Sequence, residues 1–211
     1  MDKNVLVIGA TGKTGSLICK ELEAKKINYT VFVRKQSAGK LSTKGGVIKH
    51  GDVFNAQDVE NALLDDNFTD VVIALGSAKL RNATIRSKGT EHILKAMQKG
   101  QSKASVHVIS ALGVGDSWKQ LKWHAKLLST LLLRSVMKDH SAQEDLVQNS
   151  MYPYHILRPV GLKDGASKGG VHVQNEGFLP SNYIQRADVA KYLVDSLLEG
   201  KTGVSGICEQ K

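Results

Sequence analysis

Short, continuous runs of apolar residues alternate along the chain with longer segments in which apolar residues recur at a helical period. A run that is apolar at every position is typical of a parallel strand buried on both faces. The segments between the runs have helical length and carry one apolar stripe. The predicted strands are residues 5–8, 29–33, 47–48, 71–75, 106–109 and 154–157, and the predicted helices are 14–26, 55–64, 84–99 and one ending near 149.

The C-terminal part of the chain is less regular. Residues 112–135 contain two tryptophans and a leucine cluster, and a glycine-rich loop over 161–170 precedes an extended piece at 171–178. A clear helical period returns from Ala190 to Leu198, where apolar residues recur at i, i+3, i+4, i+7 and i+8. A short strand near 204–208 follows this last helix.

Repeated strand-then-helix units predict an α/β protein whose parallel sheet is doubly wound, with helices on both faces. This is the three-layer Rossmann fold, here with a small C-terminal extension that forms the substrate pocket. We expect one domain over residues 1–211, because no linker, repeat or low-complexity segment interrupts the pattern.

A glycine-rich loop, Gly9-Ala-Thr-Gly12-Lys-Thr-Gly15, follows the first predicted strand and opens the first helix. Such a loop turns at its first glycine, lets a pyrophosphate approach at the second, and brings helix and strand together at the third. The N-terminus of the helix then offers free N–H groups to the phosphates.

The same loop is not the P-loop of a nucleoside triphosphatase. That motif needs a glycine five residues before Gly12, where this chain has Val7. The expected pyrophosphate-binding residues are Gly9, Thr11, Gly12, Lys13, Thr14 and Gly15. The alternative is a glycine turn without a ligand.

The end of the second predicted strand indicates which dinucleotide is bound. A site for NAD usually has an acidic residue there, which accepts hydrogen bonds from the ribose. This chain has Arg34 and Lys35 instead. A guanidinium can bind a 2′-phosphate through two hydrogen bonds, so the pattern favours NADP(H). The alternative is a solvated basic turn.

Further cofactor contacts are expected after the third and fourth strands, because ligands of such sheets bind beyond the carboxyl ends of the strands. Asp52 and Val53 are expected at the adenine. Leu75, Gly76 and Ser77 are expected at the ribose and pyrophosphate. Each of these segments could also be an ordinary turn.

The formal net charge of +9 favours an anionic ligand, but the basic residues are scattered without a run of five or six. We therefore expect no nucleic acid partner. Two cysteines favour a reducing cytoplasm, and the longest apolar stretch is too short to span a membrane. We expect a cytoplasmic monomer that binds neither a membrane nor a metal.

Seven segments spread along the chain carry a resemblance to a known family: Val5-Leu-Val-Ile-Gly-Ala-Thr-Gly-Lys-Thr-Gly15, Val33-Arg34, Gly51-Asp52-Val53, Ile109-Ser110-Ala111, Asp139-His140, His155-Ile-Leu-Arg-Pro159 and Arg186-Ala-Asp188-Val-Ala190. With these segments the chain resembles the atypical short-chain dehydrogenase/reductase superfamily. Within that superfamily it is similar to the small group of biliverdin IX-beta and flavin reductases, and the NmrA-like NADP-sensing proteins are neighbours.

One motif of that superfamily is missing. Its typical reductases use Tyr-x-x-x-Lys on the helix after the fifth strand, where this chain has Val136 and His140. Conventional alcohol–ketone interconversion is therefore not expected. The resemblance implies that Ser110 contacts the nicotinamide or a substrate carbonyl, or else satisfies nearby backbone. It also implies that Arg158 and Pro159 lie beside the nicotinamide.

A cofactor site that is intact but lacks a tyrosine as proton donor favours one function. We expect an NADPH-dependent reductase of a planar, conjugated acceptor such as a flavin, a biliverdin-like tetrapyrrole or a quinone. Catalysis would rest on holding two rings in stacked geometry. The expected catalytic residues are Ser110 and His140. The alternative for His140 is an unpaired histidine on the surface, which is the commoner situation for a histidine in a protein. Aromatic residues that line the acceptor pocket, or else pack in the core, are Trp118, Trp123, Phe178 and Tyr183.

Two other functions remain open. A non-catalytic NADP(H) sensor of the NmrA-like type would also lack the acid and would bind a protein partner. A dehydrogenase or epimerase of sugar nucleotides would need the missing tyrosine–lysine pair and usually a larger C-terminal domain.

Overall fold

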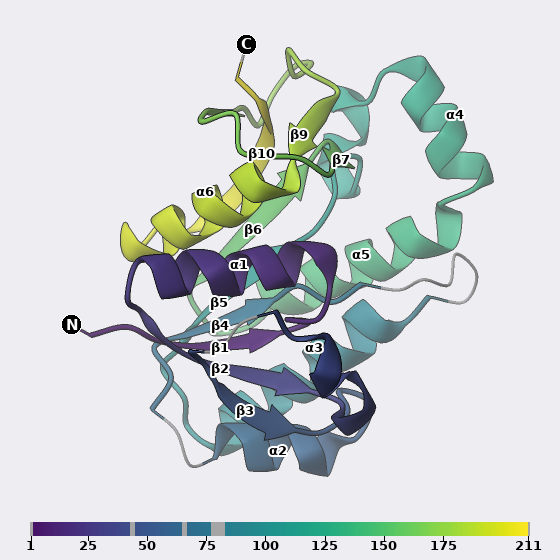
Figure 1. The fold of residues 1–211 in the computed structure, drawn as a ribbon. Helices are drawn as coiled ribbons and strands as arrows, with labels where there is room; N and C mark the ends of the chain where they lie inside the picture. The colour runs from purple at the N-terminus through teal and green to yellow at the C-terminus, as the bar shows by residue number, and fades with distance from the viewer. Residues whose placement is uncertain (1, 43–44, 65–66, 77–82, 211) are drawn as a thin grey trace.

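A long, mostly parallel sheet forms the centre of the computed structural model, which describes residues 2–42, 45–64, 67–76 and 83–210 (Figure 1). The strand order is β3-β2-β1-β4-β5-β6-β10-β8, and the edge strand β8 alone of these described strands runs antiparallel to its neighbour. The strands are β1 (Asn4–Ile8), β2 (Asn28–Val33), β3 (Val47–His50), β4 (Asp70–Ile73), β5 (Ser105–Ile109), β6 (Tyr154–Pro159), β8 (Val171–Val173) and β10 (Gly203–Glu209).

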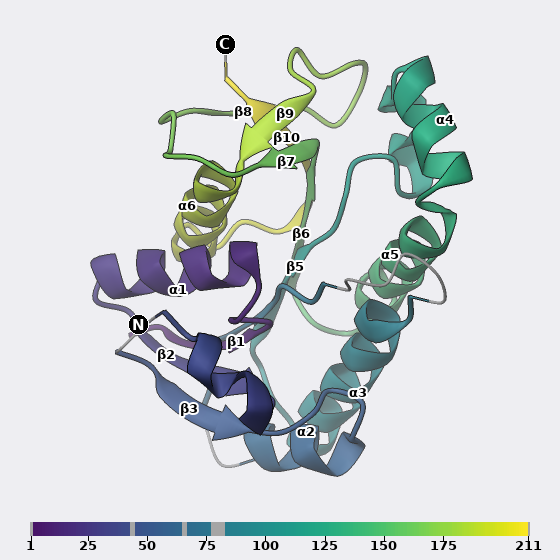
Figure 2. The ribbon, with the colours of Figure 1, turned by 45° about the vertical axis from the view of Figure 1, so that its right-hand side comes forward.

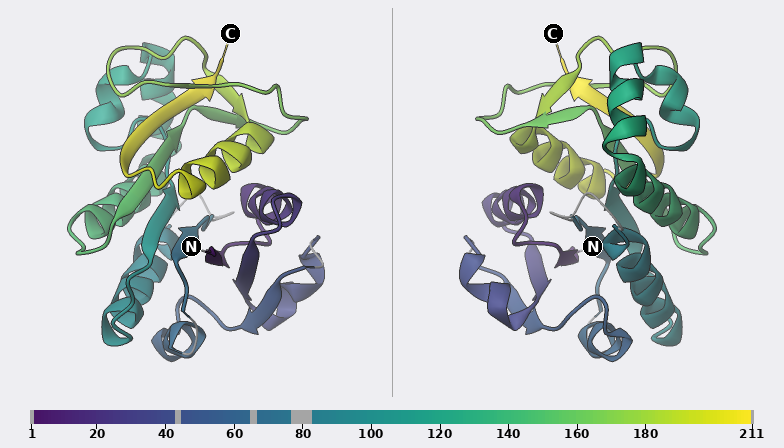
Figure 3. Two further views of the ribbon diagram at one scale, coloured as in Figure 1. Left: turned by 90° about the vertical axis from the view of Figure 1, so that its left-hand side faces the viewer. Right: turned by 90° about the vertical axis from the view of Figure 1, so that its right-hand side faces the viewer.

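Helices cover both faces of this sheet (Figure 3). α1 (Lys13–Ala24) and α6 (Arg186–Leu198) pack together on one face, and α2 (Ala56–Leu63), α3 (Ile85–Lys99) and α5 (Arg134–Gln148) cover the other. Each face has its own apolar core. Successive residues of β1 alternate between the two cores, which is why its run is continuously apolar. The predicted three-layer Rossmann fold is confirmed.

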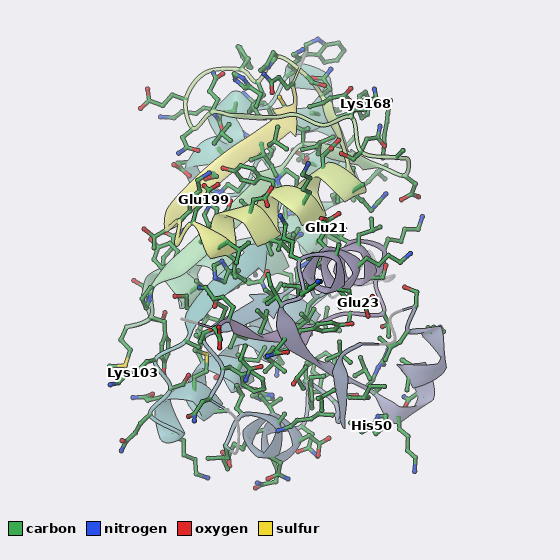
Figure 4. The ribbon with its side chains drawn as sticks, turned by 60° about the vertical axis from the view of Figure 1, so that its left-hand side comes forward. Glu21, Glu23, His50, Lys103, Lys168 and Glu199 are labelled. Carbon is green, nitrogen blue, oxygen red and sulfur yellow. The ribbon has the colours of Figure 1, made fainter. Side chains whose placement is uncertain are left out.

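Polar contacts add to this packing where α1 lies over the sheet. Glu23 of α1 accepts a hydrogen bond of 2.6 Å from the Tyr29 hydroxyl in β2. Figure 4 places Glu23 on the side of the helix that faces this strand. The hydrogen bond ties the first helix to the second strand, at whose carboxyl end Arg34 lies.

The C-terminal extension lies at one end of the molecule (Figure 2). β7 (Gly161–Lys163) and β9 (Tyr183–Gln185) pair in parallel there as a small second sheet. Residues 112–135 are more regular than expected, since they contain the 3-10 helix η2 (Gly115–Gln120) and α4 (Trp123–Leu131). A second 3-10 helix, η1 (Lys35–Lys40), follows β2.

The sheet order creates a crevice beside β1. The chain proceeds outward from β1 through β2 to β3, then returns to place β4 on the other side of β1. Connections therefore leave the carboxyl ends of β1 and β4 in opposite directions, which is where doubly wound sheets bind ligands.

Candidate functional site

A pocket of about 640 Å³ opens at this crevice, a volume usual for a small-molecule site. Both walls come from loops that follow strands, and α5 and the C-terminal extension close one end. The expected site residues that line it are Gly9, Thr11, Gly12, Lys13, Thr14, Arg34, Asp52, Val53, Leu75, Gly76, Ser110 and His140. The fold thus gathers most of the residues singled out from the sequence.

Some expected site residues do not line the pocket. Gly15 packs beneath the loop, where a Cβ atom would stand 2.2 Å from the Gly9 carbonyl oxygen. Lys35 is exposed on η1, outside the residues that line the pocket. Arg158 and Pro159 are buried behind it. Ser77 lies outside the described residues.

The glycine loop is shaped for an anion. Gly9 has φ of +93°, and a Cβ atom there would stand 2.4 Å from the Ala74 carbonyl oxygen, so the turn requires glycine. Gly12 is the N-cap of α1, whose residues are all described, and it supplies no side-chain cap. The first N–H groups of the helix, at Lys13 and Thr14, are therefore available to a phosphate.

The other end of the pocket carries a cation where an NAD site would carry an acid. Arg34 is exposed at the end of β2, and its carbonyl accepts a hydrogen bond of 2.8 Å from the Ser37 amide. Ser37 is buried and also lines the pocket. Sequence reasoning missed it, although a serine within the turn after a basic residue was a usable signal. Arg34 and Ser37 together place a guanidinium and a hydroxyl group at this end of the pocket.

Asp52 does not contribute a free acid to this end. Its carboxylate accepts a hydrogen bond of 3.0 Å from the Phe54 amide, and its own amide donates to Asp58 at 2.9 Å. These hydrogen bonds hold the turn after β3. Val53, the next residue, is buried and forms an apolar part of the wall.

Ser110 and His140 meet at the inner end of the pocket, where both are buried. The His140 Nδ1 atom lies 3.5 Å from the Ser110 Oγ atom. His140 is only 6% exposed, so the expectation of a surface histidine is wrong. Burial, and after it the charge of Arg86, lowers the pKa of His140 to about 3. The imidazole is therefore neutral at physiological pH.

The hydroxyl of Ser110 donates a short hydrogen bond to Glu144 of α5, so its side chain does not serve the nearby backbone. Glu144 was not anticipated, because a buried carboxylate on an amphipathic helix leaves no local sequence signal. It also accepts hydrogen bonds from Arg158 Nε at 3.1 Å and Nη2 at 2.7 Å. The remaining end of that guanidinium contacts Asp116 at 2.5 Å. Arg158 thus holds Glu144 rather than reaching the pocket.

A bridge of charges joins the glycine loop to the C-terminal extension. Asp164, after β7, binds the Lys13 ammonium at 2.6 Å and the Arg186 guanidinium at 2.5 Å. Both cations also line the pocket. The bridge sets the extension beside the glycine loop.

The four aromatic residues expected at the acceptor pocket are exposed, so the alternative that they pack in the core is wrong. They do not line the main pocket. Trp123 begins α4, and Tyr183 begins β9, where the Lys163 ammonium lies 3.9 Å from the centre of its ring.

The part of the chain that the structure describes holds no cluster of three or more residues suited to a metal. None of its helices is long and apolar enough to cross a membrane.

Comparisons with known proteins agree with this geometry. A family described as NAD(P)H-binding matches residues 9–199. A chloroplastic protein of Arabidopsis thaliana is 28% identical over 204 residues, which are 93% of this chain and 72% of that protein. Among solved structures, the anaerobilin reductase ChuY of Escherichia coli O157:H7 is 25% identical with a TM-score of 0.80, covering 99% of this chain and 98% of that one.

A second solved structure shares the fold. It is a short-chain dehydrogenase/reductase of Veillonella parvula in complex with NADP, 17% identical with a TM-score of 0.80, covering 99% of this chain and 95% of that one.

Proposed function

Because this chain belongs to the NAD(P)H-binding family, we propose that it is an NADPH-dependent reductase of a planar, conjugated acceptor. The acceptor classes are a flavin, a biliverdin-like tetrapyrrole or a quinone. The observation that carries the proposal is the inner end of the pocket, where Ser110 meets a neutral His140 on a helix without tyrosine. The likeness to an anaerobilin reductase supports reduction of such an acceptor.

The pocket fits NADP(H) at three places. The uncapped N-terminus of α1 suits the pyrophosphate. Arg34 and Ser37 suit the 2′-phosphate. The end of β2 carries Arg34 where an NAD site usually carries an acidic residue. Ser110 lies at the carboxyl end of β5, where the nicotinamide of a dinucleotide belongs. Bound NADPH supplies the hydride.

Ser110 acts as an acceptor toward the pocket. Its hydroxyl proton is directed to Glu144, so the remaining lone pair of Oγ is available to an N–H group of a bound ring or carboxamide. Arg158 holds Glu144 in place through hydrogen bonds from its Nε and Nη2 atoms. This arrangement orients a ring without taking part in proton transfer.

His140 forms a polar wall rather than an acid. An imidazole whose pKa is lowered to about 3 is not in its imidazolium form at physiological pH, so it cannot act as a general acid. The proton that accompanies the hydride therefore comes from solvent, which suffices for acceptors such as flavins and quinones but not for an unactivated ketone. Rate enhancement rests on the geometry of two rings held in contact.

The test is steady-state oxidation of NADPH with FMN, riboflavin, biliverdin and a quinone as acceptors. We expect turnover with at least one of them and none with simple ketones. Tight cofactor binding without turnover of any acceptor would favour the NADP(H) sensor instead.

A further inference from the structure

Arg86 is the second residue of α3 and lines the same pocket as Ser110 and His140. Its side chain is among the buried ones, with the residue only 8% exposed. The Nη1 atom of Arg86 lies 3.4 Å from Asp139, the residue directly before His140, so the guanidinium lies close to the inner end of the pocket. A buried guanidinium costs free energy unless its charge and its N–H groups are compensated.

That compensation is incomplete among the residues that the structure describes. Among the described residues, Asp139 is the one anion paired with Arg86, at 3.4 Å between Oδ2 and Nη1. Charge-assisted hydrogen bonds are usually about 2.7–2.9 Å long. The Nε atom of Arg86 is buried and has no hydrogen-bond partner in the described part of the chain.

Asp139 is also shared with the start of α3. It accepts hydrogen bonds from the Ser87 amide at 2.9 Å, the Ser87 hydroxyl at 2.7 Å and the Arg86 amide at 3.1 Å. Burial acts to raise the pKa of Asp139, but these hydrogen bonds leave it lowered. The carboxylate thus primarily caps the helix, and the guanidinium retains donors for another anion.

We propose that Arg86 binds a carboxylate or phosphate carried by the acceptor, so that the site selects anionic conjugated acceptors over neutral ones. The proposal rests on the reductase function above. The anionic groups of the cofactor have their own places, at the N-terminus of α1 and at Arg34. Arg86 instead lies with the two residues of the reactive end, and its planar guanidinium can hold either anion through two hydrogen bonds.

Two matched pairs of acceptors test this directly. FMN differs from riboflavin by one phosphate, and biliverdin differs from its dimethyl ester by two carboxylate charges. Binding is measured by flavin fluorescence, or by quenching of protein fluorescence for the tetrapyrroles, with NADP⁺ present so that no turnover occurs. The variants are Arg86→Gln, Arg86→Lys and the control Lys88→Gln, which removes a charge from the exposed face of the same helix.

We expect the wild-type protein to prefer the anionic member of at least one pair. Arg86→Gln should reduce that preference about 10-fold, in line with the loss of a charged hydrogen bond. Arg86→Lys should keep part of it, and Lys88→Gln should keep all of it. Thermal unfolding of each variant shows whether the fold is retained, and the lysine variant keeps the test valid if the glutamine variant unfolds.

Three results would overturn the proposal: no preference in either pair for the wild-type protein, a preference that Arg86→Gln leaves unchanged, or weaker NADP⁺ binding by Arg86→Gln without a change in preference. The last would make Arg86 a cofactor ligand. Failure of the reductase function is separate, because the binding preference is measured without turnover.

Discussion

The Nδ1 atom of His140 lies 3.5 Å from the Ser110 hydroxyl oxygen, and both side chains are buried at the inner end of the pocket. On its other side Ser110 donates to Glu144, which Arg158 holds in turn. Two residues of α5, one of β6 and the residue after β5 thus form one hydrogen-bonded group around the place expected for the nicotinamide. Its one histidine is neutral, so the group resembles a binding surface more than an acid–base pair.

Ser110→Ala should lower kcat by about 10-fold, because one hydrogen bond that orients the reacting ring is lost. The KM for NADPH should change little, since the phosphate contacts remain. Steady-state kinetics provide the measurement. Ser105→Ala, at the other end of β5 and outside the pocket, is the matched control. Equal activity of the two variants would remove Ser110 from the mechanism.

Arg34→Ala should lower kcat/KM for NADPH by about 10- to 100-fold, the loss expected for charged hydrogen bonds to a phosphate. Activity with NADH should hardly change, because NADH has no 2′-phosphate. Lys35→Ala is the control, since Lys35 does not line the pocket. An equal loss with both cofactors would show that Arg34 does not select NADPH.

Glu144→Ala should destabilise the protein by about 3 kcal/mol, because it leaves the buried Arg158 without its main partner. Urea denaturation monitored by circular dichroism gives the free energy of unfolding. The comparison is Glu91→Ala, which breaks an exposed ion pair with Lys95 and should cost less than about 1 kcal/mol. A similar small loss for both variants would contradict the structural role given to Glu144.

His140 should make stability fall on acidification. Its pKa is about 3 in the folded protein and near 6.5 in the unfolded chain, so below pH 6.5 the unfolded chain takes up a proton that the folded protein refuses. The free energy of unfolding should drop by up to about 1.4 kcal/mol per pH unit between these values for this one residue.

The measurement is the free energy of unfolding against pH for wild type and His140→Gln, whose slope should be shallower. His155, also buried and with its pKa lowered to about 4, contributes a similar slope that both proteins share. His50→Gln changes an exposed histidine at the end of β3 and is the control (Figure 4). Identical slopes for wild type and His140→Gln would mean that His140 is not held neutral by the fold.

The features that the sequence predicted well are those set by local pattern. Continuous apolar runs marked the parallel strands, and the three glycines marked a turn that the backbone geometry of Gly9 and the close packing of Gly15 require. The Rossmann fold follows from these repeated units. Their positions along the chain already placed the pocket at the carboxyl ends of the strands.

The features that the sequence did not reveal are set by long-range pairing of buried charges. Glu144, Arg158 and Arg86 lie on separate elements, and whether each is solvated or paired depends on packing between helix and sheet. Arg158 was expected at the cofactor, but its guanidinium is engaged by Glu144 and Asp116. α4 was missed because residues 112–135 mix leucines and basic residues without a clear helical period.

The central claim is hydride transfer from NADPH to a conjugated acceptor, and an anaerobic single-turnover experiment tests it most directly. Protein, NADPH and one acceptor are mixed, and the absorbances of NADPH and acceptor are followed together for FMN and for biliverdin. We predict that both absorbances fall in equal proportion with at least one acceptor. NADPH that binds tightly while both absorbances stay constant with every acceptor would contradict the account.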